Sequence, residues 1–498
     1  MAHINHPLRE ARHVGVRAAG CLIGLACGDA LGAHYEFGPV LGSDVLIDMI
    51  GGGPFDFEPG EFTDDTAMAL GIARGIVPAH HRRDPAGADA IDIRRVLAQW
   101  LDWLEVTKDV GVQTGAILGQ LRRAGRIDEK SCRAISKRHH AESGNRSGGN
   151  GALMRTAPVA LAFLHDTTGL AAMARRVAQL THWEEAAGDA CVLWCFAIVN
   201  AIHTGQLNIR VGLDELPEER RAYWIERIDE AESATPAHFS SDNGWVVSAF
   251  RAAWSAVHHS ITELGRIDVV DALERAVRGG NDTDTVAAIA GSLIGAAAGA
   301  AVFPARWRTI LHGWSIESER ELIALALANA EPTRSREDRW PLASHLSAKP
   351  LGTLARHPHD DGVWLGSMDM LDNLPADVTA VVSICRTGTQ QVPTQNSAVT
   401  RRVEFWLVDD IDANVDATTV VVDAADTVAT LRSEGHVVFL HCVAAHSRTP
   451  TIAAAYSARH LGHDCMTAHE EIRAVLPQHS AWRNPDFIAL LERLPQKS

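Results

Sequence analysis

Apolar residues at helical spacing dominate the larger, N-terminal part of the chain. From Val14 to about Ala330, stretches rich in Ala, Leu and Ile recur with a period near 3.6 residues and are interrupted by Gly and Asp clusters. The clearest of them predict helices over 94–106, 170–180, 187–203 and 245–258. Strand patterns are scarce here, so we expect an all-α helical domain over residues 14–330.

The pattern changes after a proline-containing stretch. Residues 331–354 combine prolines with charged residues and serine, which is typical of a linker. Beyond it, short β-branched runs at 363–365, 378–384, 403–408 and 437–440 alternate with helical patterns at 424–432 and 451–460. Strands that alternate with helices predict an α/β domain over residues 355–498 with a central, mostly parallel sheet.

Two further patterns concern surfaces. Small residues recur every four positions in two stripes, Gly20, Gly24 and Gly28 and then Gly291, Gly295 and Gly299. On a helix each stripe forms one smooth face, which favours close packing of two backbones. The charged stretch 213–241 is expected to be a solvated excursion from the helical domain.

Composition and charge narrow the function. A chain of 498 residues exceeds what one hydrophobic core usually serves, and 46% hydrophobic with 22% charged residues is typical of globular proteins. The formal net charge of −16 argues against nucleic acid or an anionic membrane as a partner. An anionic substrate must therefore be held by local groups, such as helix N-termini, metal ions or single arginines.

Cysteine spacing and apolar runs bear on the compartment. The 8 cysteines show neither a disulfide framework nor a zinc-knuckle spacing, which favours a reducing cytoplasm. Residues 9–33 resemble a signal peptide, and the uncharged run 286–302 approaches the length of a membrane span. The second run is mostly Ala and Gly and is better explained as a buried helix, so we expect a soluble, cytoplasmic protein without a membrane partner.

Carboxylates and hydroxyls gather at two predicted helix starts more than 200 residues apart. Thr63-Asp64-Asp65-Thr66 and Asp282-Thr283-Asp284-Thr285 each precede an apolar helical stretch. Helix capping explains one such residue in each cluster but not four. Hard oxygen ligands of this kind suit Mg²⁺ or Mn²⁺, and two clusters brought together would form a binuclear site.

Three further motifs accompany these clusters. Gly28-Asp29-Ala30-Leu31-Gly32 shortly precedes Glu36, and the glycine-rich segment 147–155 opens a predicted helix. Such a loop exposes backbone N–H groups that can cradle a pyrophosphate, although a single glycine-rich loop is weak support. The third motif is Thr181-His182, where a lone histidine is more often structural than functional.

In their order, these five motifs resemble the ADP-ribosylglycohydrolases of the dinitrogenase-reductase-activating type, over residues 14–310. The resemblance implies an all-α fold with two Mg²⁺ or Mn²⁺ ions and makes Glu36 a ligand or a gating carboxylate near the scissile bond. It implies metal ligation by Thr63, Asp64, Asp65, Asp282, Asp284 and Thr285. The implied contacts to ADP-ribose come from Ser147, Gly148, Gly149, Asn150, Gly151 and His182. Asn281 departs from the family pattern because it separates Gly280 from the Asp cluster.

The chemistry expected of such a site is hydrolysis of an anomeric bond through an oxocarbenium-like transition state. Metal ions can orient the ribose hydroxyls and activate water, with Asp65 or Glu36 as the general base. The substrate would be an ADP-ribosylated protein or a small ADP-ribose conjugate, and the residues do not select the linkage. The alternative is a pseudoenzyme that binds nucleotides or only packs, which the presence of every acidic residue disfavours.

A second constellation lies near the C-terminus. Cys442 and Arg448 fit the Cys-x5-Arg spacing of cysteine-dependent phosphatases, but Cys132 and Arg138 fit it too. Only Cys442 follows a buried-strand pattern, and only Arg448 precedes a helical run with Pro450 in its first turn. The strand, loop and helix order favours the pair of Cys442 and Arg448.

The expected chemistry is a thiolate attack on phosphorus. Cys442 is the predicted nucleophile, Arg448 holds the phosphate oxygens, and Asp410 would protonate the leaving group unless it is merely part of a loop. His441 and Thr449 would order and deprotonate the thiol. The predicted phosphate-binding loop comprises Cys442, Val443, Ala444, Ala445, His446, Ser447 and Arg448.

Residues 355–498 resemble dual-specificity protein phosphatases in this loop and in Trp364-Leu365-Gly366. The resemblance implies that Asp410 is the general acid and that the substrate is phosphorylated. Ala445 stands where the family usually has glycine, so a positive φ there would be strained. The alternative is a non-catalytic module that binds phosphate or a phosphoprotein and regulates the helical domain.

Overall fold

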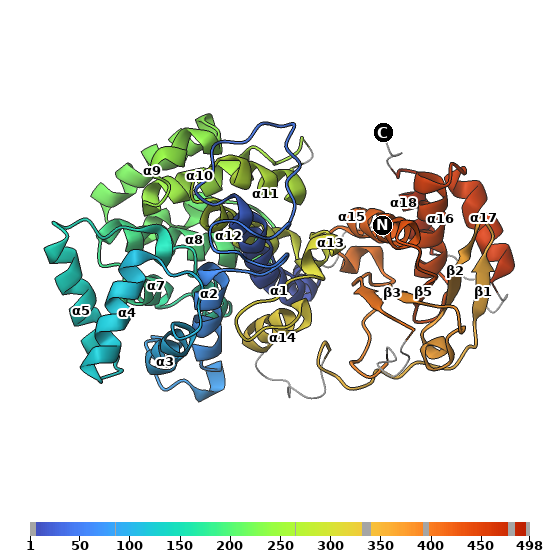
Figure 1. Ribbon diagram of the computed structural model, residues 1–498, viewed down its shortest axis with the longest axis horizontal. Helices are drawn as coiled ribbons and strands as arrows, with labels where there is room; N and C mark the ends of the chain where they lie inside the picture. The colour runs from blue at the N-terminus through green and yellow to red at the C-terminus, as the bar shows by residue number, and fades with distance from the viewer. Residues whose placement is uncertain are drawn as a thin grey trace. The chain divides into compact units, whose positions relative to one another are not determined.

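The computed structural model describes residues 6–84, 86–263, 265–330, 340–391, 398–476 and 484–494, with side chains from His13 onward. The chain divides into two compact units, coloured from blue to yellow and from yellow to red in Figure 1. One unit runs from His6 to Phe303 and resumes at Ile310, and the other comprises Pro304–Thr309 and the C-terminal part of the chain. The segment Pro304–Thr309 precedes the predicted linker but groups with the C-terminal unit. In the described part of that linker, residues 340–353 form no helix or strand.

The N-terminal unit is all-helical, as the apolar spacing predicts. Its described residues form only isolated β-bridges besides the helices. The α-helices are α1 (His6–Gly32), α2 (Asp64–Gly75), α3 (Ile93–Trp103), α4 (Val112–Ala124), α5 (Glu129–Glu142), α6 (Ala157–Ala162), α7 (Leu170–Ala178), α8 (Glu185–Thr204), α9 (Glu218–Ser233), α10 (Val246–His258), α11 (Val269–Arg278), α12 (Thr283–Ala298) and α14 (Glu319–Ala330).

The two glycine stripes pack against each other along α1 and α12, which lie side by side (Figure 1). A Cβ on Gly24 would stand 2.1 Å from the carbonyl oxygen of Gly291, and a Cβ on Gly20 would stand 2.2 Å from that of Gly295. Only glycine permits this antiparallel approach. It brings Gly32, the last residue of α1, against Asp284 in the first turn of α12. The backbone contact therefore places the second acidic cluster beside the segment that leads to Glu36.

Two described helical stretches are long and apolar enough to span a membrane, His13–Tyr35 and Glu185–Thr204. Of their most apolar windows, 89% and 83% of the residues are buried within the protein. The run 286–302, which the sequence identifies as a buried helix, falls largely in α12, and every residue of α12 is buried. These helices therefore form the core of the N-terminal unit.

The charged stretch 213–241 is not simply a solvated excursion, and this expectation is wrong in part. It contains α9, from which the Trp224 and Ile228 side chains are fully buried. The Trp224 indole lies edge-on to Phe250 of α10, with ring centroids 4.9 Å apart. Charged residues cover the outer face of an amphipathic helix whose apolar positions are few but large.

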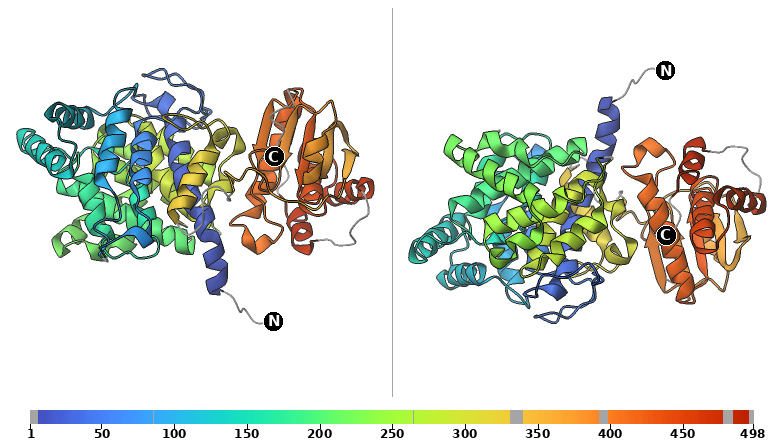
Figure 2. Two further views of the ribbon diagram at one scale, coloured as in Figure 1. Left: turned by 90° about the horizontal axis from the view of Figure 1, so that it is seen from below. Right: turned by 90° about the horizontal axis from the view of Figure 1, so that it is seen from above.

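The C-terminal unit is a five-stranded sheet in the order β1-β2-β5-β3-β4 with helices packed on it. Figure 2 shows these strands, in orange, side by side. β2, β5, β3 and β4 pair in parallel, and β1 is antiparallel to β2, so the sheet is mostly parallel. The strands are β1 (Leu354–His357), β2 (Asp360–Ser367), β3 (Ala380–Ser383), β4 (Arg401–Glu404) and β5 (Val438–Cys442). The helices are α13 (Ala305–Arg308), α15 (Ala417–Ser433), α16 (Arg448–His460), α17 (Cys465–Val475) and α18 (Pro485–Leu491).

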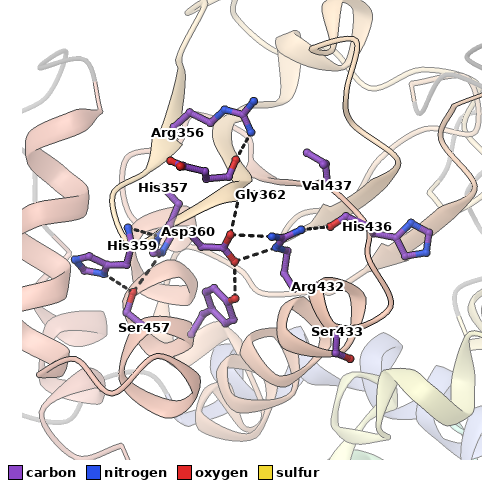
Figure 3. Close-up of polar contacts among 12 residues, drawn as sticks. Arg356, His357, His359, Asp360, Gly362, Arg432, Ser433, His436, Val437 and Ser457 are labelled. Atoms are coloured by element: carbon purple, nitrogen blue, oxygen red, sulfur yellow. Dashed lines mark hydrogen bonds and ion pairs between the residues drawn. The ribbon is translucent and has the colours of Figure 1, made fainter.

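A carboxylate at the start of β2 joins the hairpin β1–β2 to two helices (Figure 3). Asp360 accepts hydrogen bonds from Arg432 of α15 through both carboxylate oxygens, at 2.9 and 3.0 Å. The Tyr456 hydroxyl of α16 donates to the same carboxylate at 2.7 Å. This network fixes the outer edge of the sheet against α15 and α16.

Candidate functional site

The acidic motifs of the N-terminal unit converge on one buried cluster. Ligand atoms of Asp29, Asp65 and Asp284 lie within 4.8 Å of one another, and so do those of Glu36, Asp282 and Asp284. Asp284 belongs to both groups, so the two groups are contiguous. The Thr63 hydroxyl donates toward Asp65 at 3.1 Å and toward Asp284 at 3.4 Å. The structure thus brings the two helix starts and Glu36 together.

Asp29 fixes the start of α2. One of its carboxylate oxygens accepts from the backbone N–H of Thr63 at 2.8 Å. The other accepts from the N–H and the hydroxyl of Thr66 at 2.9 and 2.6 Å. A side chain from α1 therefore satisfies the exposed N–H groups that a local N-cap would otherwise satisfy. Asp64 and Asp65 therefore do not cap α2, and their carboxylates face the site.

Without a bound cation, the negative charges of this cluster are unfavourable. Burial raises the pKa values of Asp64, Asp65 and Asp284 well above their usual range, and repulsion from neighbouring carboxylates adds to it. Burial, followed by repulsion from Asp282, raises the pKa of Glu36 to about 9. Closely spaced buried carboxylates cannot all ionise without compensating positive charge.

Carboxylate oxygens without partners show where positive charge fits. Among the described residues, one buried oxygen on each of Glu36, Asp65, Asp282 and Asp284 has no hydrogen-bond partner. Buried acceptors of this kind are normally satisfied, so four of them in one cluster favour a cationic ligand. All-oxygen donors suit hard divalent cations, and the residues present therefore fit Mg²⁺ or Mn²⁺.

A cavity of about 650 Å³ opens beside the cluster. Its lining includes Glu36, Asp64, Asp282, Asp284 and Thr285 from the acidic motifs, and Gly149, Asn150, Gly151 and His182 from the predicted substrate-binding motifs. The Asn150 side-chain amide donates to Asp282 at 2.8 Å and links the glycine-rich loop to the acidic cluster. Most of the predicted metal and substrate residues thus line one cavity, and Thr63 and Asp65 contact it through the acidic cluster.

Ser147 and Gly148, two of the predicted ADP-ribose contacts, lie at the start of the glycine-rich loop. Neither is among the lining residues of the cavity. The backbone N–H of Ser147 donates to the Glu184 carboxylate at 3.0 Å, and a Cβ on Gly148 would collide with that same carboxylate. These two residues hold the loop in place, whereas Gly149, Asn150 and Gly151 face the cavity.

Asn281 adopts a left-handed conformation with φ of 61°. Asparagine tolerates this conformation better than most residues. Its side-chain amide donates to the Ser240 carbonyl and to Asn243 Oδ1, at 2.9 and 2.8 Å. The extra residue is therefore accommodated as an anchored turn just before Asp282.

The Cys442 loop lies between β5 and α16, which is the setting that the sequence predicts. Cys442 is the last residue of β5 and is buried. In the described part of the chain, no hydrogen bond is made by the backbone N–H groups of Val443, Ala444, Ala445 or Ser447. A run of unsatisfied N–H groups before a helix start forms a concave site for an anion.

Arg448 is the first residue of α16, and one nitrogen of its guanidinium holds the side chain in place. Its Nη1 donates to the carbonyl oxygens of Ile384 and Leu407 at 3.2 and 2.8 Å. Its Nε is buried without a partner among the described residues, and so are the Ser447 and Thr449 hydroxyls. The free donors of this segment therefore match an anion. The thiol-ordering contact predicted for Thr449 is absent from the described hydrogen bonds.

Ala445 confirms that the loop needs a left-handed residue, because its φ is 56°. Alanine in this region costs about 1–2 kcal/mol relative to the right-handed region. The neighbouring His441 donates or accepts at Ser383 Oγ, 2.7 Å away, and burial lowers its pKa to about 4. His441 is thus neutral and holds two strands together instead of contacting the thiol through an ion pair.

Asp410 lies in an exposed turn that begins the short 3₁₀ helix η8 (Ile411–Ala413). Its carboxylate accepts from the backbone N–H of Asp412 at 3.2 Å. The Leu407 carbonyl that accepts from Arg448 lies three residues earlier in the chain, so this turn is tethered to the Cys442 loop. Its neighbour Asp409 accepts from Asn484 at 3.1 Å.

Comparison with known proteins identifies the N-terminal unit. The sequence model of the ADP-ribosylglycohydrolases matches residues 11–337, which is well over half of the 498-residue chain. The chain belongs to the ADP-ribosylglycohydrolase family. The helical fold, the motif order and the buried acidic cluster agree with this membership.

Curated relatives cover the same part of the chain. ADP-ribosylarginine hydrolase Tri1 of Serratia proteamaculans is 28% identical over 58% of this chain and 74% of its own length. ADP-ribosyl-[dinitrogen reductase] glycohydrolase of Rhodospirillum rubrum is 28% identical over 61% of this chain and 92% of its own. Human ADP-ribosylhydrolase ARH3 is 25% identical over 62% of this chain and 92% of its own.

Two solved structures are similar to parts of the chain. An ADP-ribosylglycohydrolase-related protein complex is 26% identical, covers 65% of this chain and 99% of that chain, and has a TM-score of 0.46. Human DUSP28 is 19% identical, covers 30% of this chain and 96% of that chain, and has a TM-score of 0.25.

Sequence reasoning missed two acidic residues of this ADP-ribosylglycohydrolase site. Asp29 lies inside a quoted motif, but its action on Thr63 and Thr66 depends on the packing of α1 against α2. Asp109 lines the cavity, and burial, followed by repulsion from Asp282, raises its pKa to about 6. A single aspartate in a short polar loop carries no spacing signal that could have identified it.

Proposed function

We propose that the helical unit is a metal-dependent hydrolase that removes ADP-ribose from a modified protein side chain or a small acceptor. The observation that carries the proposal is the buried cluster of carboxylates with unpartnered oxygens at one wall of a cavity that the glycine-rich loop also lines. Thr63, Asp64, Asp65, Asp282, Asp284 and Thr285 would hold two Mg²⁺ or Mn²⁺ ions. Relatives named as ADP-ribosylarginine hydrolase and ADP-ribosylhydrolase support the substrate class.

Residues of the chain orient the substrate and transfer the proton. When bound, the two cations supply Lewis-acid polarisation of the ribose hydroxyls and of water. Gly149, Asn150 and Gly151 orient the ADP part of the substrate, and Asn150 keeps Asp282 in place. Glu36 or Asp65 takes the proton from the attacking water while the anomeric bond breaks. The acceptor leaves with the bonding electron pair and takes the proton that the carboxylate accepted from water, which returns the carboxylate to its starting state.

The proposed activity is tested by ADP-ribose release from arginine-linked and serine-linked substrates by the full chain. We expect release in Mg²⁺ or Mn²⁺, none in EDTA, and a loss of at least 100-fold in Glu36→Gln, which keeps the shape but not the carboxylate. Release from one linkage names the acceptor. Binding of ADP-ribose without release from either linkage would indicate the nucleotide-binding alternative.

For the C-terminal unit we propose a cysteine-dependent phosphatase active on a phosphorylated substrate. The unsatisfied N–H groups of the loop and the unpartnered Arg448 Nε support it. The Cys442 sulfur would attack phosphorus as Asp410 protonates the leaving oxygen, and water would then hydrolyse the phosphocysteine. The alternative is a module that binds phosphate without turnover. Hydrolysis of p-nitrophenyl phosphate that Cys442→Ser abolishes would support the enzyme, and phosphate binding without hydrolysis would support the module.

A further inference from the structure

Arg155 is a fully buried arginine without an acidic partner. Its side chain has 0% exposure, and it forms no ion pair with any residue of the described ranges. Burial, the largest cause, lowers its pKa to about 10, so the guanidinium is charged at neutral pH. Burying an unpaired charge is costly, and the contacts that Arg155 makes instead indicate what it does.

Those contacts are one aromatic face and two acceptors. The guanidinium lies 4.2 Å from the centroid of the Trp100 ring and donates to the Met68 sulfur at 3.3 Å. Its Nη2 donates to the Thr181 hydroxyl at 2.5 Å. The other neighbour of that hydroxyl is Nδ1 of His182, 2.8 Å away. Arg155, Thr181 and His182 therefore form one hydrogen-bonded relay.

Only one set of hydrogen-bond directions gives every polar hydrogen of this relay an acceptor. A guanidinium can only donate, so the Thr181 oxygen accepts from Arg155. Within the described structure the single hydroxyl proton has only Nδ1 of His182 as an acceptor. Burial and the nearby Arg155 charge hold the pKa of His182 well below its usual range, so the ring carries one proton. In the arrangement where Nδ1 accepts, that proton is on Nε2.

Nε2 of His182 faces the glycine-rich loop. A Cβ on Gly149 would stand 3.1 Å from this nitrogen, and a Cβ on Gly151 would stand 3.2 Å from it. Both glycines and His182 line the cavity. The Gln113 side-chain amide donates to the carbonyls of Thr181 and Ser147, at 2.7 and 3.1 Å, and holds the two segments together. The relay thus places the Nε2–H donor of His182 beside the backbone of the glycine-rich loop, at the wall of the cavity.

We propose that Arg155 is a positioning residue that acts through Thr181 to fix the His182 tautomer. In this tautomer Nε2–H donates to an anionic oxygen of the ADP-ribose diphosphate. The other tautomer would present a nitrogen lone pair to the same oxygen and repel it. The inference rests on the proposed function of the cavity and deepens it, because it assigns the selection of a diphosphate to a residue that does not touch the substrate.

Variants of Thr181 test the relay in steady-state kinetics of the full chain. Thr181→Val removes the hydroxyl at nearly constant volume, and Thr181→Ser keeps it. We expect Thr181→Val to raise KM about tenfold, the effect of one lost hydrogen bond to a charged group, with kcat within about twofold. Thr181→Ser should restore the wild-type KM. Arg155→Met should match Thr181→Val, and the double variant should be no worse, since both break one chain.

The ring nitrogens of His182 provide a readout that does not depend on activity. In ¹⁵N spectra of the ligand-free full chain, assigned by difference from His182→Gln, we expect a protonated Nε2 and an unprotonated Nδ1, with loss of that preference in Thr181→Val. A protonated Nδ1 in the wild type would overturn the relay even if ADP-ribose were hydrolysed. A wild type that fails to bind ADP-ribose would overturn the proposed function, and the spectrum would still decide the relay.

Discussion

The two units use helix N-termini in opposite ways. In the helical unit, Asp29 satisfies the N–H groups at the start of α2, and the cavity receives surplus carboxylate oxygens. In the C-terminal unit, the N–H groups before α16 stay unsatisfied and lie beside Arg448. A capped helix start rich in acids suits cations, and an uncapped one suits anions. Whether a site suits a cation or an anion thus depends on whether the N–H groups at the helix start are already capped by protein side chains.

The two sites also differ in how far apart their residues lie in the chain. The cation site combines Glu36, the 63–66 cluster and the 282–285 cluster, which the packing of α1 on α12 and on α2 brings together. The anion site comes from one continuous strand, loop and helix. A defect in packing should therefore destroy the first site and spare the second.

The largest expected effect is on the surplus carboxylates. Asp284→Asn removes the carboxylate that belongs to both acidic groups, and we expect ADP-ribose release to fall by on the order of 10³-fold. Initial rates in saturating Mg²⁺ measure it. Asp214→Asn, at a side chain 89% exposed, is the matched control and should keep the wild-type rate. An Asp284→Asn enzyme with near-normal rate would remove the acidic cluster from the mechanism.

Gly24→Ala tests whether packing builds the cation site. The new Cβ would stand 2.1 Å from the Gly291 carbonyl oxygen, so the backbones must separate, and we expect a loss of about 3 kcal/mol in the free energy of unfolding of the helical unit. Denaturant unfolding measures it. Gly115→Ala in α4 meets nothing closer than 3.4 Å and should be neutral or stabilising by up to about 1 kcal/mol. Equal effects of the two substitutions would contradict the role of the stripe.

The pH dependence of stability in the absence of cations tests whether the buried carboxylates of the cation site repel one another. The pKa of Glu36 is raised from 4.5 to about 9, and those of Asp29 and Asp109 are raised to about 6. The folded state therefore binds more protons than the unfolded state between these values, so stability falls as pH rises from about 4.5 to 9. In EDTA we expect the Tm of the helical unit to drop by roughly 5 °C between pH 5.5 and 8.5. Mg²⁺ should remove most of the drop, and a rise of Tm with pH in EDTA would contradict it.

The smallest expected effect is in the anion loop. Ala445→Gly relieves the left-handed alanine and should stabilise the C-terminal unit by about 0.5–1 kcal/mol, after the greater entropy of glycine in the unfolded chain is included. Ala444→Gly, where φ is not positive, should destabilise by a similar amount. Thermal unfolding of the C-terminal transition measures both. The same sign for the two neighbours would mean that the loop is not strained at Ala445.

Sequence patterns located the long apolar helices and the approximate positions of β2, β3, β4 and β5 along the chain, because those depend on local periodicity. They missed β1, since Leu354-Ala355-Arg356-His357 is short and polar and is a strand only through its pairing with β2. They overestimated the exposure of 213–241, because charged residues outnumber its buried large apolar residues, which are Leu213, Leu216, Trp224, Ile228 and Phe239. The motifs marked the acidic cluster, but its Asp29 and Asp109 depend on tertiary packing.

The central claim is that the surplus carboxylates of the helical unit hold divalent cations, and direct Mn²⁺ binding tests it. Electron paramagnetic resonance of free Mn²⁺, titrated into EDTA-treated and dialysed full chain, counts the ions bound per chain. We expect two ions for the wild type and for Cys442→Ser, and a loss of tight binding in Asp284→Asn. No bound Mn²⁺ in the wild type, or unchanged binding in Asp284→Asn, would contradict the account.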